Sequence, residues 1–321
     1  MEMSRGRNPH PDEHGARVSR TFAIATRTRT AAVTIAAALG ALVLTAPMAS
    51  AAPAQPSWAP AETAPIRPGV AMETDGASCT SNFVFTSGDR TFLGQAAHCA
   101  GTGSATDTSG CTAGSLPLGT PVTIRAADGT ARIGTLAYSS WLAMQESGET
   151  DQDVCHYNDF ALVELAASDV ADVNPSIPFF GGPTGLDADG LTRGEHVYGY
   201  GNSPLRQGID MLSPQAGLAA TDAGAGRGHQ VYVLTPGVPG DSGSAYLDGN
   251  GNAVGVLSTL NFSPMPGSNG VADLAQALDY AAAHGAVGNV ELVAGTRPFD
   301  PGPADDAVDK LRALKDLIAN R

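Results

Sequence analysis

The chain has 321 residues and carries 18 lysine and arginine residues against 32 aspartate and glutamate residues, a net charge of −14 at pH 7. A surface this negative repels phosphate groups, so nucleic acid is excluded as an expected partner. The length is sufficient for one large domain or two small ones.

The N-terminal segment has the pattern of a secretory signal. An arginine-bearing stretch precedes the apolar run Ala31–Ala46, and the small-x-small triplet Ala49-Ser50-Ala51 follows it. We therefore expect residues 1–51 to be a signal peptide, the mature protein to be secreted, and no membrane association after cleavage. A single membrane anchor is the alternative, but the apolar run is short for a span of about 20 residues.

Residues 52–69 are rich in alanine and proline and are expected to be a flexible leader or short propeptide. From residue 70 onward, short runs of Val, Ile, Phe, Tyr and Thr alternate with Gly, Asp, Asn and Ser, which predicts antiparallel strands in a sandwich or barrel. The expected strands cover residues 82–86, 90–94, 122–125, 131–136, 160–165, 196–200, 229–234, 245–247, 253–257 and 290–293.

Two helices are expected near the C-terminus. Apolar residues recur at helical spacing from Val271 to Ala282, and Gly285 stands where that helix would stop. After a proline-rich stretch, Asp305 and Asp306 open a second amphipathic pattern. This tail is expected to be an exposed terminal helix, with docking on the body or on a partner as the alternative.

All four cysteines, Cys79, Cys99, Cys111 and Cys155, lie in the first half of the mature chain. An even number in an exported protein predicts two disulfides, for which three connectivities are possible, and we choose Cys79–Cys99 with Cys111–Cys155. A zinc site is disfavoured because no C-x-x-C occurs. The acidic loop 146–153 is expected to be solvated rather than to bind calcium, and no metal or cofactor is expected.

One glycine-rich loop, Thr235–Ser244, holds Ser242 between two glycines, Gly240 and Gly243, directly before an apolar run. A serine hydroxyl is a poor nucleophile at neutral pH, so chemistry here needs a base and donors for the oxyanion. The backbone N–H groups of Gly240 and Ser242 can converge beside the hydroxyl, because glycine lacks side-chain restrictions. Taken alone, the loop is equally compatible with an ordinary turn.

A base for Ser242 should be a histidine that a carboxylate orients. His98 follows an expected strand, sits in a turn of small residues and is adjacent to Cys99. Asp159 stands directly before an apolar strand, where a buried carboxylate needs donors such as a histidine N–H. Taken singly, a structural histidine and a turn aspartate are the simpler interpretations.

The segments Ala96–Cys99, Asn158–Leu165 and Gly240–Ser244, in this order, resemble the signature blocks of the chymotrypsin-like (trypsin-like) serine proteases, bacterial secreted branch. The resemblance covers about residues 70–298 and implies an all-β fold of two antiparallel six-stranded β-barrels. The first barrel would occupy residues 70–185 and the second 186–298, with a helix after the nucleophile-bearing region and an amphipathic tail at 299–321.

By this resemblance, His98 is the general base, Asp159 its orienting carboxylate and Ser242 the nucleophile. The N–H groups of Gly240 and Ser242 form the oxyanion hole. The Cys79–Cys99 pairing matches the family's disulfide beside the histidine, and Ser258 would line the substrate cleft and contact Asp159.

The sequence departs from the family pattern at Pro236, at Leu260 and in lacking an Ile-Val-Gly-Gly block. Pro236 stands where members with basic specificity carry an aspartate, and Leu260 stands where many members have glycine. We therefore expect an altered substrate cleft without Arg/Lys specificity. Because no Ile-Val-Gly-Gly block supplies a new N-terminus, Asp241 is expected to pair with another group, such as an arginine.

The leading hypothesis is a secreted, monomeric serine endopeptidase that hydrolyses protein or peptide substrates through an acyl-enzyme. A protease-like fold used as a non-catalytic binding module is the alternative, and Pro236 and Leu260 are its best support. An α/β-hydrolase is disfavoured, because that fold requires serine before aspartate before histidine along the chain.

Overall fold

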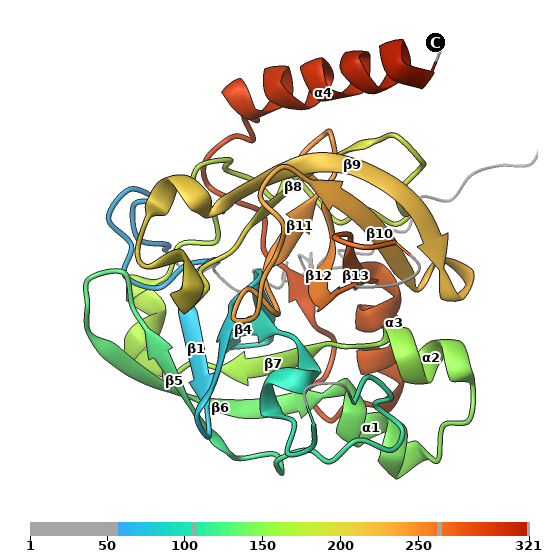
Figure 1. The fold of residues 1–321 in the computed structure, drawn as a ribbon. Helices are drawn as coiled ribbons and strands as arrows, with labels where there is room; N and C mark the ends of the chain where they lie inside the picture. The colour runs from blue at the N-terminus through green and yellow to red at the C-terminus, as the bar shows by residue number, and fades with distance from the viewer. Residues whose placement is uncertain (1–56, 105–106, 262–264, 320–321) are drawn as a thin grey trace, which may run out of the picture. The chain divides into compact units, whose positions relative to one another are not determined.

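The computed structural model describes residues 57–104, 107–261 and 265–319, without the side chains of 311 and 314–319. The predicted signal peptide lies outside the described residues. Strands predominate (Figure 1). They are β1 (Ala71–Thr74), β2 (Ala77–Thr80), β3 (Val84–Ser87), β4 (Arg90–Gln95), β5 (Pro121–Arg125), β6 (Ala131–Ser139), β7 (Ala161–Glu164), β8 (His196–Tyr200), β9 (Pro214–Ala223), β10 (Gly228–Val233), β11 (Ala245–Leu247), β12 (Ala253–Leu260), β13 (Asn269–Asp273) and β14 (Glu291–Leu292).

The second half of the chain forms a closed barrel with the strand order β10-β13-β12-β11-β8-β9. Every neighbouring pair is antiparallel. One of the two predicted six-stranded barrels is therefore confirmed. The long strand β9 and the strand β13 were not expected from the sequence, because their alanines and glycines give little β signal.

The first half forms an eight-stranded sheet in the order β14-β3-β4-β7-β6-β5-β1-β2, rather than the expected six strands. The additional edge strand β14 comes from far along the chain, where Glu291 and Leu292 pair with Thr86 and Phe85. Closure of this sheet into a barrel and the domain limits at 70–185 and 186–298 stay predictions.

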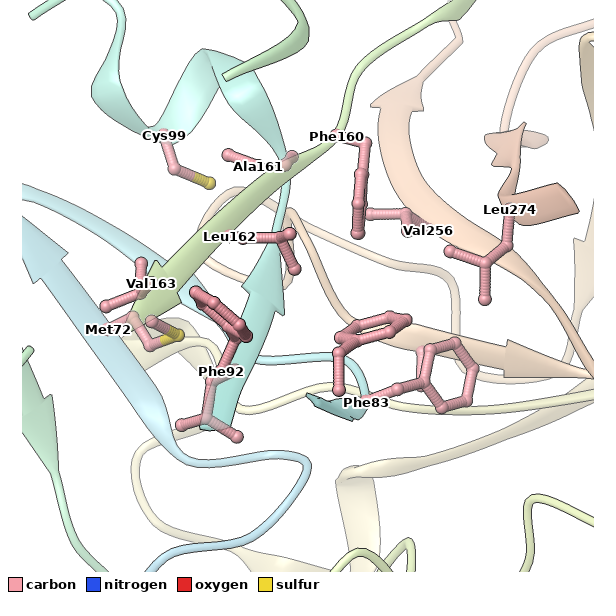
Figure 2. Packing of buried hydrophobic residues seen from close by; sticks show 14 of the residues in the cluster. Met72, Phe83, Phe92, Cys99, Phe160, Ala161, Leu162, Val163, Val256 and Leu274 are labelled. Carbon is pink, nitrogen blue, oxygen red and sulfur yellow. The ribbon is translucent and has the colours of Figure 1, made fainter. Parts of the chain in front are cut away.

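Apolar side chains from both halves share one core (Figure 2). Phe160, which directly precedes β7, and Leu162 of β7 belong to the same cluster as Phe92 of β4, Val256 of β12 and Leu274. All five are completely buried. Because Phe160 directly follows Asp159, this packing fixes the backbone that carries the candidate carboxylate.

In the described ranges, four α-helices accompany the strands: α1 (Ser140–Ser147), α2 (Gln152–Tyr157), α3 (Leu274–His284) and α4 (Pro303–Ala319). Helix α3 confirms the helix expected there, although it starts later than its apolar pattern because Asp273 caps it and Val271 belongs to β13. The tail is helical as expected, but α4 docks on the body instead of standing exposed, since Val308 is completely buried and Asp305 accepts a hydrogen bond from the Tyr198 hydroxyl at 2.6 Å. The short helices α1 and α2 were not expected, since their apolar residues lack helical periodicity. Among the described helices, none is long and apolar enough to span a membrane.

The expectation of a flexible leader up to residue 69 is wrong for its described part, 57–69. Ile66 is completely buried and forms a bridge with Val173. The backbone N–H of Ala59 donates to the Val173 carbonyl at 2.8 Å, and the Asn174 side chain donates to the Ala59 carbonyl. The segment therefore packs on the body, because its few apolar residues find partners more than a hundred residues away.

Candidate active site

The three candidate catalytic residues come from three separate connections. His98 lies in a short 3-10 helix, η1 (Ala97–Ala100), directly after β4. Asp159 lies between α2 and β7, and Ser242 lies in the loop between β10 and β11. The chain order of the motifs thus corresponds to three loops that the tertiary structure brings to one cleft.

His98 and Asp159 are joined by two hydrogen bonds. The His98 Nδ1–H donates to Asp159 Oδ2 at 2.6 Å, and the His98 backbone N–H donates to Asp159 Oδ1 at 2.9 Å. The hydroxyl of Ser258, on β12, donates to the same Oδ2 at 2.6 Å. Three donors therefore satisfy a carboxylate whose side chain is only 6% exposed. Because a carboxylate only accepts, Nδ1 must carry a proton, and Nε2 is left as the basic nitrogen.

The electrostatics of this pair favour the charged forms of both groups. Burial lowers the pKa of His98, but the negative charge of Asp159 and the hydrogen bond to it prevail, so this pKa lies above its usual value. Burial likewise raises the pKa of Asp159, but the His98 charge and the hydrogen bonds from His98 and Ser258 hold it below its usual value. The carboxylate thus stays ionised and stabilises an imidazolium when one forms.

Ser242 lines the same cleft as His98 and Asp159. No hydrogen bond joins the Ser242 hydroxyl to the His98 ring within the described part of the chain. The cleft therefore contains all three side chains, with the His98–Asp159 half already bonded. Catalytic hydrogen bonds are often long in unliganded sites and tighten only with substrate.

The backbone next to Ser242 presents two free donors. In the described residues, no protein acceptor takes the N–H groups of Gly240 or Ser242. Gly240 has a φ of +99°, a conformation open to glycine, and a Cβ at this position would lie 2.8 Å from Pro204 Cδ. The two N–H groups are therefore not used by other groups of the described chain.

The loop that carries Ser242 is fastened to the first half of the chain. The Thr80 N–H donates to the Ser242 carbonyl at 2.8 Å, and the Thr80 hydroxyl donates to the Gly240 carbonyl at 2.8 Å. The Asn82 side chain donates to the Gly243 carbonyl at 3.0 Å. Gly243 also touches this half, since a Cβ there would lie 2.7 Å from the Thr80 carbonyl oxygen. These contacts hold the loop carrying Ser242 on the half that carries His98.

Asp241 pairs with Arg206, which lies in the 3-10 helix η3 (Pro204–Arg206). Arg206 Nε and Nη2 donate to the two oxygens of Asp241, and both side chains are buried, at 8% and 0% exposure. The backbone N–H groups of Ser203 and Val238 also donate to Asp241. The expected arginine partner of Asp241 is thus present, and the pair fixes the turn that positions the Gly240 and Ser242 N–H groups.

The two disulfides are Cys79–Cys99 and Cys111–Cys155, the pairs chosen from the sequence. Cys99 follows His98, so its bridge to Cys79 at the end of β2 restrains the backbone beside the base. Among the described residues, the atoms Cys79 Sγ, Cys99 Sγ and one His98 nitrogen lie within 4.8 Å of one another. Because the two sulfurs are bonded to each other, they are not thiolates and cannot hold a metal.

The cleft has a volume of about 710 Å³. Ser258 and Leu260 line it, as expected, but Pro236 is exposed and is not among its lining residues. Instead, the Pro236 carbonyl accepts a hydrogen bond from Arg206 at 3.2 Å. The residues that line this side of the cleft are Gly237, Val238 and Pro239, in place of the expected Pro236.

Four residues of the site were not found from the sequence: Thr80, Asn82, Arg206 and Asn269. Asn269 is completely buried, and its amide accepts from the Gly237 N–H and donates to the Gly237 carbonyl. Each of these residues forms a hydrogen bond with a partner 30 or more positions away in the sequence, and no recognisable motif surrounds it. For Arg206, the family resemblance indicated only that Asp241 would have another partner, such as an arginine, without saying which one.

The site thus has the components of nucleophilic serine chemistry on a mostly β fold with one closed barrel. No family model matches the chain, and no curated protein matches it. The structure is similar to solved bacterial chymotrypsin-like serine proteases.

Protease A from Thermobifida fusca is 18% identical, with a TM-score of 0.45 over 72% of this chain and 99% of that one. The Nocardiopsis protease is 17% identical, with a TM-score of 0.44 over 71% and 98%. The chymotrypsin of Cellulomonas bogoriensis is 17% identical, with a TM-score of 0.43 over 71% and 98%. Similarity at this level of identity concerns the backbone fold alone. The chemistry of the site is therefore inferred from the residues of this chain.

Proposed function

We propose that this protein is a serine endopeptidase that cleaves peptide bonds through an acyl-enzyme. The observation that carries the proposal is the buried Asp159 carboxylate bonded to His98 and Ser258, in a cleft that also contains Ser242 and two free backbone donors. A buried carboxylate that orients a histidine beside a serine is the arrangement that activates a serine hydroxyl.

In the proposed mechanism, His98 Nε2 removes the proton from the Ser242 hydroxyl as its oxygen attacks the substrate carbonyl. The N–H groups of Gly240 and Ser242 stabilise the oxyanion of the tetrahedral intermediate. Asp159 stabilises the imidazolium, which then protonates the leaving amine. Water, activated by the same nitrogen, hydrolyses the acyl-enzyme and regenerates the free serine.

The test compares the wild type with Ser242→Ala and Ser244→Ala. Ser244 lies two residues away, is buried, and does not line the cleft, so its variant is a matched control. We expect the wild type and Ser244→Ala to be labelled by a fluorophosphonate probe and to cleave a mixed peptide library, and Ser242→Ala to do neither. Equal cleavage by Ser242→Ala refutes the mechanism.

A protein-binding module without catalysis is distinguished by the same experiment. Such a module would leave the wild type unlabelled and the library intact, while a protein ligand stays bound and uncleaved. That result would replace the proposed function by the binding one.

We further propose that the chain is exported, cleaved after Ala51 and active as a monomer without a cofactor. Two disulfides support an oxidising compartment. N-terminal sequencing of protein from the culture medium is expected to begin at Ala52. Recovery of the full-length chain from the membrane fraction would indicate an anchor instead.

A further inference from the structure

One edge of β12 is open beside Ser242. β11 pairs with β12 only from Ala253 to Val256, whereas β13 pairs with it as far as Leu260. Among the described residues, the edge from Ser258 to Leu260 therefore has no strand on its other side, and this segment lines the cleft. Extended peptides bind such edges through main-chain hydrogen bonds, with pockets for alternate side chains.

The position of a bound peptide follows from this edge and from the oxyanion donors. With the scissile carbonyl at the N–H groups of Gly240 and Ser242, the residue on its amino side (P1) lies next to β12. Its side chain enters between two walls, the segment Gly237–Pro239 and the segment Leu257–Leu260, both of which line the cleft.

These two walls carry no charge. The ionisable residues that line the cleft are His98, Asp159 and Asp107. The first two are bonded to each other, and Asp107 belongs to the loop after His98, where its carboxylate accepts a hydrogen bond from the Ser104 N–H at 2.9 Å. A lysine, arginine, aspartate or glutamate side chain that enters between the walls would therefore lose its hydration without gaining an ionic partner from either wall.

Asn269 closes the space between the walls without offering a donor. Its Nδ2 group donates to the Gly237 carbonyl at 3.1 Å and to the Thr259 carbonyl at 3.2 Å, which uses both hydrogens. Its Oδ1 accepts from the Gly237 N–H at 2.8 Å. The amide thus ties the two walls together, and it has no hydrogen left for a substrate carboxylate.

The depth between the walls is limited by Leu257. A Cβ at Gly237 would lie 2.6 Å from Leu257 Cδ2 and 3.0 Å from Asn269 Nδ2, so these side chains already fill the space against the Gly237 backbone. Leu257 itself is buried, at 3% exposure. A P1 side chain that enters from Ser242 therefore meets Leu257 and Asn269 after a short distance.

We infer that the cleft selects small or medium-sized uncharged aliphatic side chains at P1, from alanine to leucine, and that Leu257 and Asn269 set this limit. The inference rests on the proposed endopeptidase function and names its substrate class.

The test uses peptidyl diphenyl phosphonates that differ only at P1, and measures the second-order rate of Ser242 labelling by intact mass. These probes need an activated serine but no turnover. We expect the Ala, Val and Leu probes to react at least about 100-fold faster than the Arg, Lys, Asp and Glu probes, and about tenfold faster than the Phe probe.

Substitutions at Leu257 and at Gly237 should shift the preference for P1 side-chain size in opposite directions. Leu257→Ala deepens the space and is expected to raise the Phe-to-Val rate ratio about tenfold, and Leu257→Val should raise it less if the alanine variant folds poorly. Gly237→Ala pushes Leu257 or Asn269 toward the substrate and should lower the Leu-to-Ala ratio. The controls Val254→Ala, on the same strand and outside the cleft, and Gly185→Ala should leave both ratios unchanged.

The outcomes distinguish failure of the inference about P1 from failure of the proposed function. Fastest labelling by a charged probe, or an unchanged Phe-to-Val ratio in both Leu257 variants, overturns the inference about P1 and leaves the proposed function standing. Labelling by a simple fluorophosphonate but by no peptidyl probe also overturns the inference alone. Absence of labelling by every probe, the fluorophosphonate included, overturns the proposed function and the inference together.

Discussion

His98 is the residue whose protonation should set the pH dependence of activity. A general base must be neutral, and the charge of Asp159 and its hydrogen bond outweigh burial to raise the pKa of His98 above the usual 6.5. We therefore expect kcat/KM to rise with pH through a midpoint above 6.5 and to level off at higher pH. A pH-rate profile that is already flat at pH 6 would contradict this assignment.

Asp159→Asn tests the cause of that shift. The amide removes the charge that raises the pKa of His98 but leaves its burial, so the midpoint for His98 in an NMR titration should move to lower pH. Turnover is expected to fall about 10⁴-fold, because the amide also favours the wrong tautomer.

Arg206 is expected to be the most sensitive residue outside the cleft. Replacing it by methionine leaves the completely buried Asp241 without its cation, which should cost about 3–5 kcal/mol in the free energy of unfolding. Fluorophosphonate labelling should slow as well, because the loop Val238–Ser242 loses its support. Urea unfolding and labelling rates measure both effects.

The double variant Arg206→Met/Asp241→Asn provides the comparison for that prediction. It removes both charges, so it should recover part of the lost stability relative to Arg206→Met alone. An Arg206→Met protein as stable as the wild type would show that the ion pair does not hold this turn.

At the scale of elements, His229 links three of them. It lies on β10, its Nδ1 is 2.8 Å from Asp222 on β9, and its Nε2 is 3.0 Å from Asp273, which also caps α3. Both ring nitrogens face carboxylates, so the bonded form is the imidazolium. Burial lowers the pKa of His229, but hydrogen bonds to Asp273 and Asp222 and their charges prevail, and the pKa is raised.

Since the folded-state pKa of His229 lies above the unfolded value of about 6.5, its contribution to stability is complete below that pH. The contribution is lost as the pH rises through the raised pKa. We expect His229→Gln to be destabilised by about 2 kcal/mol at pH 6, and the difference from the wild type to shrink at alkaline pH. Chemical unfolding at several pH values measures this difference. A difference that is constant with pH would mean that the side chain acts by packing alone.

At the scale of the whole molecule, the segment 57–69 packs as part of the fold. Its Ile66 is completely buried, and the Ile66 N–H and carbonyl bond to Asp172 and Asn174. A chain that starts at Val70 should lose at least the roughly 2–5 kcal/mol that Ile66→Ala costs, and should label more slowly. A chain that starts at Ser57 is the control and should match the wild type in urea unfolding. Equal stability of both chains would restore the leader interpretation.

How much of this protein the sequence predicts depends on how local each feature is. The motifs around His98, Asp159 and Ser242 are short, and the residues that define each motif are adjacent in the sequence. Most strand segments likewise follow from the alternation of side chains within a few residues. The need of Asp241 for a partner other than a new N-terminus follows from the family resemblance, because no Ile-Val-Gly-Gly block occurs.

Other features depend on contacts that no local pattern records. Thr80 and Asn82 hold the Ser242 loop across 160 or more positions, and Asn269 joins Gly237 to β12 across 32. The placement of β14 in the first sheet and the packing of residues 57–69 are equally remote in sequence. Taken by itself, the sequence determined which residues could react and in which class of fold. The tertiary structure alone decided which loops hold them in place and how deep the cleft is, because both depend on packing between distant segments.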